Sequence, residues 1–380
     1  MRIAIVSEGF RPYVGGVETR YTKLAERLSR RHDVDVITLL HDIHASEDEV
    51  PAEESCGRLR VFRIRVDGKY FLRDGTRSLS GVKEFSRRCV ESLRKNDYDV
   101  VLVSEWPLLH ILYLRKRTDH RMIVDWHEVW GKYYWKFGIK GLGGYILEKI
   151  VAGLRGIKHV AVSDFTRNRL KKILRVHGDV PVIWNGVDLD EYGEISAVKR
   201  EFGKIVFFGR FAPHKGIELL IDAFKIVRRS RPEATLHIIG DGPLRDRVTF
   251  TASKVDGVQV HLAIPRKKLL EHIKSAWVAA IPSSREGQGI SYFEAMAAGT
   301  PVIAARSPYN AFSSMARDGE DALIVERERS ALAKGILRLL KDEHLWRRLS
   351  ENGKKFAFRF TWDEIILKLE KVLKDVEESS

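Results

Sequence analysis

An alternation of short apolar strands with amphipathic helices constrains the fold of this chain more than any other feature. Residues 2–8 form an apolar β-rich run, residues 17–30 show helical periodicity, and residues 33–40 form a second apolar run. Such alternation is typical of a parallel sheet covered by helices on both faces. Further strands are predicted at residues 59–66, 99–104, 122–126, 159–163 and 180–184.

The alternation starts again after a break in the segment 185–194. We therefore predict an α/β chain of two tandem doubly wound, Rossmann-like domains, residues 1–190 and 191–360, that face each other across a cleft. Ligands of such sheets bind beyond the carboxyl ends of the strands, so the site is expected in that cleft. In the second half, strands are predicted at 204–210, 235–243, 258–262, 278–281 and 301–304, and helices at 216–230, 267–275, 291–298, 329–341, 344–358 and 361–378.

Composition and charge limit the class of protein. No apolar run reaches the roughly 18–20 residues of a membrane span, and the N-terminal apolar stretch is too short for a signal peptide. Cys56 and Cys89 cannot form a disulfide framework or a zinc site. A cytoplasmic location is therefore expected. The net charge of +14 lies mainly before residue 186 and favours an anionic partner, although a basic surface without a partner has the same composition.

The most informative segment is residues 281–304, IPSSREGQGISYFEAMAAGTPVIA. Gly287 and Gly289 follow a predicted strand, and a helix is predicted to begin near Ile290. Glycines let an anion approach the backbone amides, and a helix N-terminus adds N–H donors and the positive end of the helix dipole. We expect a diphosphate to bind there.

Two carboxylates flank this loop: Glu286 precedes the glycines, and Glu294 lies about two turns into the helix. They are suited to accept hydrogen bonds from sugar hydroxyls and from a ribose. Ser291 and Glu294 also match a helix capping box, and Glu286 alone is compatible with an ordinary surface carboxylate. The combination of strand, glutamates, glycines and helix favours the ligand site.

This segment resembles the signature of family 4 of the retaining glycosyltransferases, also called group 1 glycosyltransferases, which have the GT-B fold. The resemblance implies a hexosyltransferase whose first domain binds the acceptor and whose second domain binds the nucleotide-sugar. It also implies that the helix at 361–378 returns to the first domain. Other family segments occur in order: Gly15-Gly16 after the first strand, AVSDFTRNRL (161–170), WNGVD (184–188), FFGRFAPHKGIELLIDAF (207–224), IIGDGPLRDRV (238–248) and FTWDEIILKLEKVL (360–373).

The resemblance also implies roles for individual residues. Two would act on the sugar near the reacting centre: Glu286, on its hydroxyls, and His127, after a strand of the first domain. The donor-binding residues would be Gly15, Gly16, Arg210 and Lys215 at the diphosphate, Ile264 and Pro265 at the base, Gly287, Gln288, Gly289 and Ile290 in the anion loop, and Glu294 at the ribose.

The chain departs from the family pattern at three places. Gln288 stands where the family usually has Phe, Glu128 stands where Asp is more usual, and the segment 305–325 is changed, so no contacts are carried over to it. The pairs Asp33/Asp35 and Asp188/Asp190 fit strand edges and turns better than a metal site. We therefore expect no metal and no cofactor beyond the nucleotide-sugar, with a UDP-, GDP- or ADP-linked donor. Asn185-Gly186 is interpreted as a simple turn.

The first domain is expected to bind an anionic or lipid-linked hydroxyl acceptor at the cytoplasmic membrane face. Aromatic residues stack on sugars or lie at bilayer interfaces, but they also form ordinary cores. A sugar-nucleotide epimerase of the same fold and a non-enzymatic nucleic-acid-binding protein remain as alternatives. The residues behind the acceptor hypothesis are the aromatics Trp126, Trp130, Tyr133, Tyr134, Trp135 and Phe137 and the basic residues Arg87, Arg88, Arg115, Lys116, Arg117 and Arg121.

Overall fold

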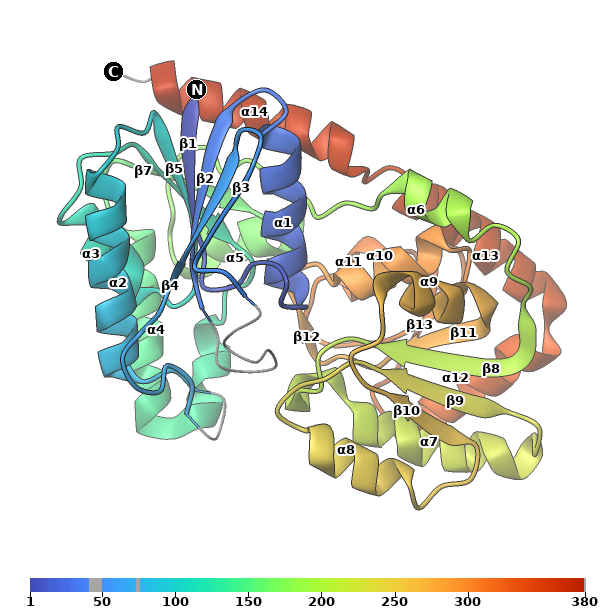
Figure 1. Cartoon of the computed structure of the whole chain (residues 1–380). Coiled ribbons are helices and arrows are strands. Elements are labelled where there is room, and N and C mark those ends of the chain that lie inside the picture. The colour runs from blue at the N-terminus through green and yellow to red at the C-terminus, as the bar shows by residue number, and fades with distance from the viewer. Residues whose placement is uncertain (41–49, 73–75, 379–380) are drawn as a thin grey trace. The chain divides into compact units, whose positions relative to one another are not determined.

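The computed structural model describes residues 1–40, 50–72 and 76–378, which divide into two units (Figure 1). Unit 1 comprises Met1–Trp184 and Trp362–Ser380, and unit 2 comprises Asn185–Thr361. The expected boundary lay after residue 190, whereas the units divide after Trp184. The C-terminal helix belongs to unit 1, so unit 2 is inserted into unit 1 along the chain.

Within the described residues, unit 1 is built around a seven-stranded sheet in the order β3-β4-β2-β1-β5-β6-β7. Its strands are parallel except β3, which pairs antiparallel with β4. Ile5 of β1 lies opposite Val36 of β2 and Leu102 of β5, and all three are buried, as expected for a sheet covered on both faces. The strands are β1 (Arg2–Val6), β2 (Asp33–Leu39), β3 (Glu53–Cys56), β4 (Leu59–Ile64), β5 (Val100–Ser104), β6 (Met122–Trp126) and β7 (Ile157–Ala161).

Helices cover the two faces of this sheet. One core cluster joins Ile3 and Ile5 to Leu24 and Leu369, which belong to the first and last helices. Another joins the alternate strand residues to the α2 and α3 side chains. This alternation follows from the period of two along a strand. The helices of unit 1 are α1 (Gly16–Leu28), α2 (Leu79–Arg94), α3 (Leu109–Arg115), the 3-10 helix η1 (Gly131–Phe137), α4 (Gly138–Ala152), α5 (Asp164–Ile173) and α14 (Trp362–Glu378).

Unit 2 contains, within the described chain, a six-stranded parallel sheet in the order β10-β9-β8-β11-β13-β15. The strand order reverses between β8 and β11, so the loops that follow these two strands leave the sheet side by side, which is where ligands of such sheets bind. The strands are β8 (Glu201–Phe208), β9 (Thr235–Ile239), β10 (Val258–His261), β11 (Ala276–Ile281), β13 (Val302–Ala305) and β15 (Leu323–Val325), and β12 (Arg285–Glu286) forms a separate parallel pair with β14 (Tyr309–Asn310).

The helices of unit 2 follow most of its strands, as the alternating pattern predicted. The expected helix at 329–341 is found at those bounds, and the other helices expected in unit 2 differ by one residue at one or both ends. They are α6 (Leu189–Glu194), the 3-10 helix η2 (Pro213–Lys215), α7 (Ile217–Ser230), α8 (Arg245–Ala252), α9 (Arg266–Ser275), α10 (Ile290–Ala297), α11 (Phe312–Met315), α12 (Arg329–Lys341) and α13 (Glu343–Ala357).

Two local predictions were wrong. The segment 180–184 is not a strand, because only Val182 bridges to Ala161 and Pro181 has no N–H to extend the pairing. Asn185-Gly186 is not a turn, because the backbone of Asn185 is held by a distant side chain, which is described below. The edge strand β3 and the short β15 were missed because both are too short to show periodicity.

Candidate functional site

The expected anion loop follows β11 and leads into α10. Gly289 is the residue that precedes the helix, and its φ of +86° lies in the left-handed region that favours glycine. A Cβ at this position would also lie 2.5 Å from the ring of Tyr292. Glycine is therefore required at position 289 both by backbone conformation and by packing.

The capping-box interpretation requires Ser291 to cap the N-terminus of α10, but it does not do so. The helix begins at Ile290 with Gly289 as its N-cap, so Ser291 lies inside the first turn. The Tyr292 N–H donates to the Gly289 carbonyl oxygen at 3.1 Å, so the amides of Ile290 and Ser291 are the first-turn groups suited to donate to an anion. The Glu294 side chain pairs with Arg266 rather than with the start of its own helix.

Glu286 and Lys215 are brought into direct contact by unit 2. Lys215 Nζ lies 2.6 Å from Glu286 Oε1, and both side chains are largely buried. Lys215 comes from the loop after β8, where Gly216 has a φ of +71°. A Cβ on Gly216 would lie 2.8 Å from the carbonyl oxygen of Pro282, so glycine lets this loop pack against the end of β11.

Cations gather around His214 in the same loop. Burial lowers the pKa of His214 to about 2, and nearby positive charges add to this effect, so the imidazole is neutral. The cations that face it are Lys215, Arg285 and Arg210. Arg210, which was predicted to bind the diphosphate, is exposed. Arg285 was not predicted as a site residue, although it directly precedes Glu286 in the sequence.

Arg327 adds a further guanidinium close to this loop. Its Nε donates to the carbonyl oxygen of Pro282 at 3.2 Å. A Cβ at Gly216 would lie 3.2 Å from Arg327 Nη2. No sequence motif singled out Arg327, because it lies far along the chain, beyond β15.

Glu294 lies near the segment expected at the base. Its Oε1 forms an ion pair of 2.5 Å with Nη1 of Arg266, the first residue of α9. Ile264 and Pro265 directly precede Arg266, and Pro265 is the N-cap of α9. The structure therefore brings Glu294 close to this segment, through an arginine that the sequence analysis did not include.

Gln288 turns away from the loop and into the protein. Its side chain is 2% exposed. Its Oε1 accepts a hydrogen bond from the Asn185 N–H at 2.5 Å, and its Nε2 donates to the Asn185 carbonyl oxygen at 2.9 Å. The side chain that we expected to contact the donor thus holds the first residue of unit 2.

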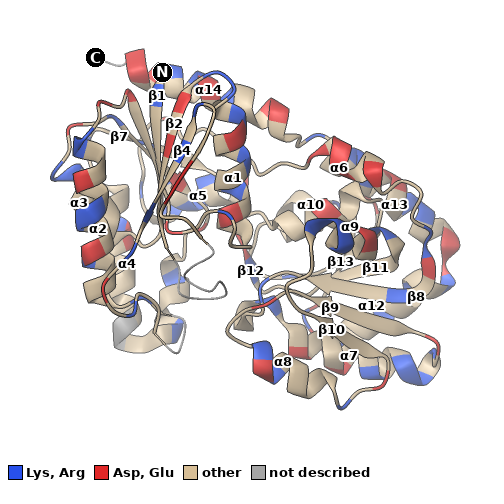
Figure 2. Cartoon of the chain, viewed as in Figure 1, with Lys and Arg blue, Asp and Glu red and all other residues tan. Residues whose placement is uncertain are grey.

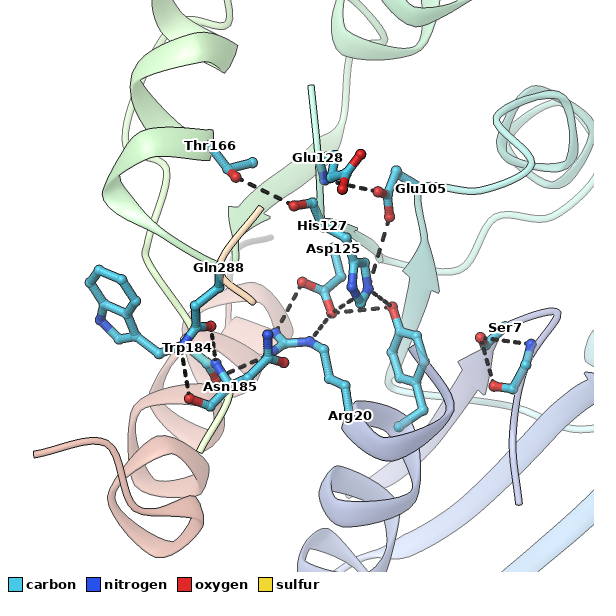
Figure 3. A network of polar contacts seen from close by, with 12 residues as sticks. Ser7, Arg20, Glu105, Asp125, His127, Glu128, Thr166, Trp184, Asn185 and Gln288 are labelled. Carbon is cyan, nitrogen blue, oxygen red and sulfur yellow. Dashed lines mark hydrogen bonds and ion pairs between the residues drawn. The ribbon is translucent and has the colours of Figure 1, made fainter. Parts of the chain in front are cut away.

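Unit 1 contains a buried polar network around His127, which follows β6 (Figure 3). Arg20 of α1 forms a bidentate ion pair with Asp125 of β6, with Nε–Oδ2 at 2.7 Å and Nη2–Oδ1 at 3.0 Å. The Tyr21 hydroxyl lies 3.1 Å from Asp125 Oδ2 and 3.2 Å from His127 Nε2. Helix α1, which starts at the predicted Gly15-Gly16, therefore also positions His127.

The charges in this network are set by burial. Burial lowers the pKa of His127 to about 4, although Asp125 opposes this effect, so the imidazole is neutral near pH 7. Burial and the charge of Asp125 raise the pKa of the Glu105 carboxyl well above its usual range. Glu105 Oε1 accepts the backbone N–H of Glu128 at 3.1 Å. A neutral imidazole in this position can donate a hydrogen bond to a sugar hydroxyl or accept one from it.

The N-terminus of α1 differs from that of α10. Gly15 is its N-cap and has an extended backbone. A Cβ on Gly15 would overlap the Glu18 carboxylate, which therefore packs against this glycine. Glu18 must therefore move before an anion can approach Gly15 from that side.

The aromatic segment of unit 1 divides into buried and exposed residues. Trp126 is fully buried, and its indole N–H donates to His159 Nδ1 at 3.0 Å, so it is a core residue rather than a surface one. Trp130 packs against the ring of Phe137, with centroids 5.8 Å apart. Trp135 and Phe137 are more than half exposed.

Comparison with protein families covers almost the whole chain. Residues 14–191 match the model of Glycosyltransferase Family 4, and residues 190–356 match the model of Glycosyl transferases group 1.

Individual relatives match over nearly their full length. The chain is 27% identical to the phosphatidyl-myo-inositol mannosyltransferase of Mycobacterium tuberculosis, over 99% of this chain and 97% of that protein. It is 26% identical to an uncharacterized glycosyltransferase of Methanocaldococcus jannaschii, over 97% and 96% of the two chains.

Solved structures show the same fold at lower sequence identity. Sucrose-phosphate synthase from Thermosynechococcus elongatus superposes with a TM-score of 0.81 at 21% identity, over all of both chains. The Anabaena protein HepE in complex with UDP-glucose superposes with a TM-score of 0.74 at 17% identity, over 99% of this chain and 100% of that chain.

Proposed function

Since this chain belongs to the group 1, family 4 glycosyltransferases and has their GT-B fold, we propose that it is a retaining hexosyltransferase. It moves a sugar from a nucleotide-diphospho-sugar to a hydroxyl acceptor. The observation that carries this proposal is the contact of Lys215 with Glu286, which lies three residues before the N-cap of α10. The complex of HepE with UDP-glucose supports a nucleotide-sugar donor.

The chemistry of the leaving group explains the arrangement of charges in unit 2. Cleavage of the bond between sugar and diphosphate places negative charge on the diphosphate. Fixed cations and helix amides stabilise such charge best, and one well-placed donor is commonly worth ~3 kcal/mol of barrier. Lys215, Arg210 and the α10 amides supply these groups, so the proposed transfer step uses no metal ion.

Glu286 has two tasks in this proposal. In the structure it holds Lys215 by an ion pair. When the diphosphate binds, Lys215 moves to the phosphate oxygens and the Glu286 carboxylate accepts hydrogen bonds from the sugar hydroxyls. Glu294 and the segment at Ile264 and Pro265 receive the ribose and the base, with Arg266 released from Glu294.

The anomeric carbon keeps its configuration if the acceptor attacks it from the same face from which the diphosphate departs. The bond between the anomeric carbon and the diphosphate oxygen breaks, and the acceptor oxygen forms the new bond. The proton of the acceptor hydroxyl passes to the released diphosphate. His127, neutral near pH 7, orients the sugar by a hydrogen bond.

The donor site is tested by substituting its charged pair. K215A and E286A should each lower turnover with the active nucleotide-sugar by at least about 100-fold. K215A removes a cation that stabilises the departing charge, and E286A removes the carboxylate that positions Lys215 and the sugar. K225A and E326A change an exposed lysine and an exposed glutamate elsewhere in unit 2 and should retain activity. Thermal shifts with UDP-, GDP- and ADP-sugars identify the donor beforehand.

Two outcomes would contradict this assignment. One is near-wild-type transfer by both K215A and E286A, with unchanged circular dichroism. The other is isomerised sugar-nucleotide after incubation of the donor without acceptor, which would favour the epimerase. A nucleic-acid-binding protein is disfavoured because basic and acidic residues are interspersed on the helices of each unit (Figure 2).

An exposed apolar face on η1 and α4 supports a lipid-linked acceptor at the cytoplasmic membrane face. Exposed lysines flank it, which suits an anionic bilayer. Elsewhere the basic residues are partly neutralised, since Arg87 and Arg88 pair with Glu91 and Glu84. Among the described helices, none has the length and apolar character to cross a bilayer. The face consists of Trp135, Phe137, Leu142, Ile146 and Ile150, and the lysines are Lys132, Lys136 and Lys149.

Sedimentation with anionic vesicles tests this membrane contact. The double variant W135S/F137S should bind vesicles at least about tenfold more weakly than the wild type at low salt. F250S, which changes an exposed phenylalanine of unit 2, is the control. The membrane proposal fails if the wild type does not sediment with the vesicles or if the double variant sediments equally well.

A further inference from the structure

Three histidines of unit 2 converge although they are far apart in the sequence. His237 lies in β9, His261 is the last residue of β10, and His272 lies in α9. One ring nitrogen from each lies within 4.8 Å of the others. No motif in the sequence singled them out.

The geometry of the triad is close to that of a metal site. His237 Nδ1 and His261 Nε2 lie 3.0 Å apart. Two imidazole nitrogens bound to one tetrahedral Zn²⁺ lie about 3.3 Å apart, given Zn–N distances of about 2.0–2.1 Å. The ring of His272 lies 4.5 Å from that of His261 and 5.3 Å from that of His237, centroid to centroid. A small shift of His272 would bring three nitrogens around one point.

The state of these side chains also suits a metal. His272 Nδ1 is buried and has no hydrogen-bond partner among the described residues. A buried polar atom without a partner destabilises the fold, and a bound metal ion would supply that partner. Burial lowers the pKa of His237 to about 4, and it also lowers the pKa of His261 and His272. Neutral imidazoles keep the lone pair that a metal requires.

We propose that His237, His261 and His272 bind one Zn²⁺ ion, with water as the fourth ligand. Three imidazoles suit zinc and neighbouring late transition metals rather than Mg²⁺ or Ca²⁺. The ion ties β9 and β10 to α9 and so stabilises unit 2. The triad lies outside the loop from β11 to α10, although His261 and His272 flank the segment assigned to the base in the sequence. The zinc proposal itself does not rest on the proposed function.

The charges around the triad permit a cation. Lys204 faces all three imidazoles, Glu201 faces His237 and His272, and Glu271 faces His272. Its Nζ is held by Glu201 Oε1 and Ser275 Oγ, each at 2.8 Å. The Glu201 carboxylate thus compensates the positive charge of Lys204 beside the site.

Zinc binding is measured on the full chain, free of any affinity tag and treated with chelator. Titration against a chromophoric zinc chelator should give about one Zn²⁺ per chain. H261Q and H272Q should each weaken zinc binding at least about tenfold. Loss of a residue that only orients a metal ligand already lowers metal affinity by about that factor, and loss of the ligand itself should lower it at least as much. H344Q changes an exposed histidine of α13 and should bind like the wild type.

Cobalt provides a readout of geometry that does not depend on enzymatic activity. Co²⁺ added to the wild type should give the intense visible absorption of a four-coordinate ion, and H261Q and H272Q should lose it while keeping their circular dichroism. The proposal is overturned if the wild type binds no zinc, or if both variants bind zinc with unchanged affinity. The triad would then be a hydrogen-bonded histidine cluster only.

Discussion

At the scale of single residues, Gln288 shows how a side chain in a ligand motif can serve the protein instead. An amide offers one acceptor and one donor group, so Gln288 pairs with both the N–H and the carbonyl of Asn185. A phenylalanine, usual in the family at this position, cannot make either bond. Gln288 thus connects the anion loop to the start of unit 2.

We therefore predict that Q288A lowers the free energy of unfolding by about 1–3 kcal/mol, because two buried hydrogen bonds are lost. Q259A, on the exposed side of edge strand β10, should change it by no more than about 0.5 kcal/mol. Urea unfolding followed by fluorescence measures both. Equal stability of Q288A and the wild type would show that these bonds contribute little.

At the scale of secondary-structure elements, one buried carboxylate joins α4 to η1. Glu148 of α4 accepts the backbone N–H of Trp130 at 2.7 Å and that of Gly131 at 2.9 Å. Burial raises the pKa of Glu148 to about 7, although these two hydrogen bonds oppose the shift. The folded chain therefore holds this proton at pH values where an unfolded chain releases it.

This shift makes a prediction about pH. A carboxyl group with a raised pKa in the folded state destabilises the fold as pH rises from its unfolded pKa, about 4.5, to about 7, and the effect then levels off. Over this range the wild type should lose up to about 3 kcal/mol of stability relative to E148Q, which does not titrate. Denaturant unfolding of both proteins between pH 4.5 and 8 measures the difference. A constant difference would mean that Glu148 has an ordinary pKa in the folded chain.

At the scale of the whole molecule, the chain leaves unit 1 at Trp184 and returns to it at Trp362. Helix α14 packs on α1 in unit 1 (Figure 1). Trp362, Ile365 and Leu369 are each about 2% exposed or less. Unit 1 is therefore complete only after unit 2 has been synthesised.

Leu369 and its neighbour Leu367 give a matched test of this packing. L369A should lower the stability of unit 1 by about 2–5 kcal/mol, because it leaves a cavity between α14 and α1. Leu367 is 52% exposed, so L367A should cost no more than about 0.5 kcal/mol. Thermal unfolding of the two variants measures the difference, and equal midpoints would contradict the packing role of α14.

Much of the architecture follows from local patterns. Apolar runs such as 122–126 and helical periodicity such as 329–341 predicted elements at their observed bounds. Glycine signals also held, since Gly289 ends a loop at a positive φ. These predictions succeeded because strand and helix periods and glycine conformations depend on residues close together in the chain.

The rest depended on contacts between residues distant in the chain. Ser291 and Glu294 have the spacing of a capping box, yet Glu294 pairs with Arg266 instead. The contact of Gln288 with Asn185 and the contact of His237 with His272 also join residues that are far apart in the sequence. Local sequence defines which groups a segment offers. Which of them meet is decided by the packing of separate strands and helices, since buried polar groups must find partners wherever the fold places them.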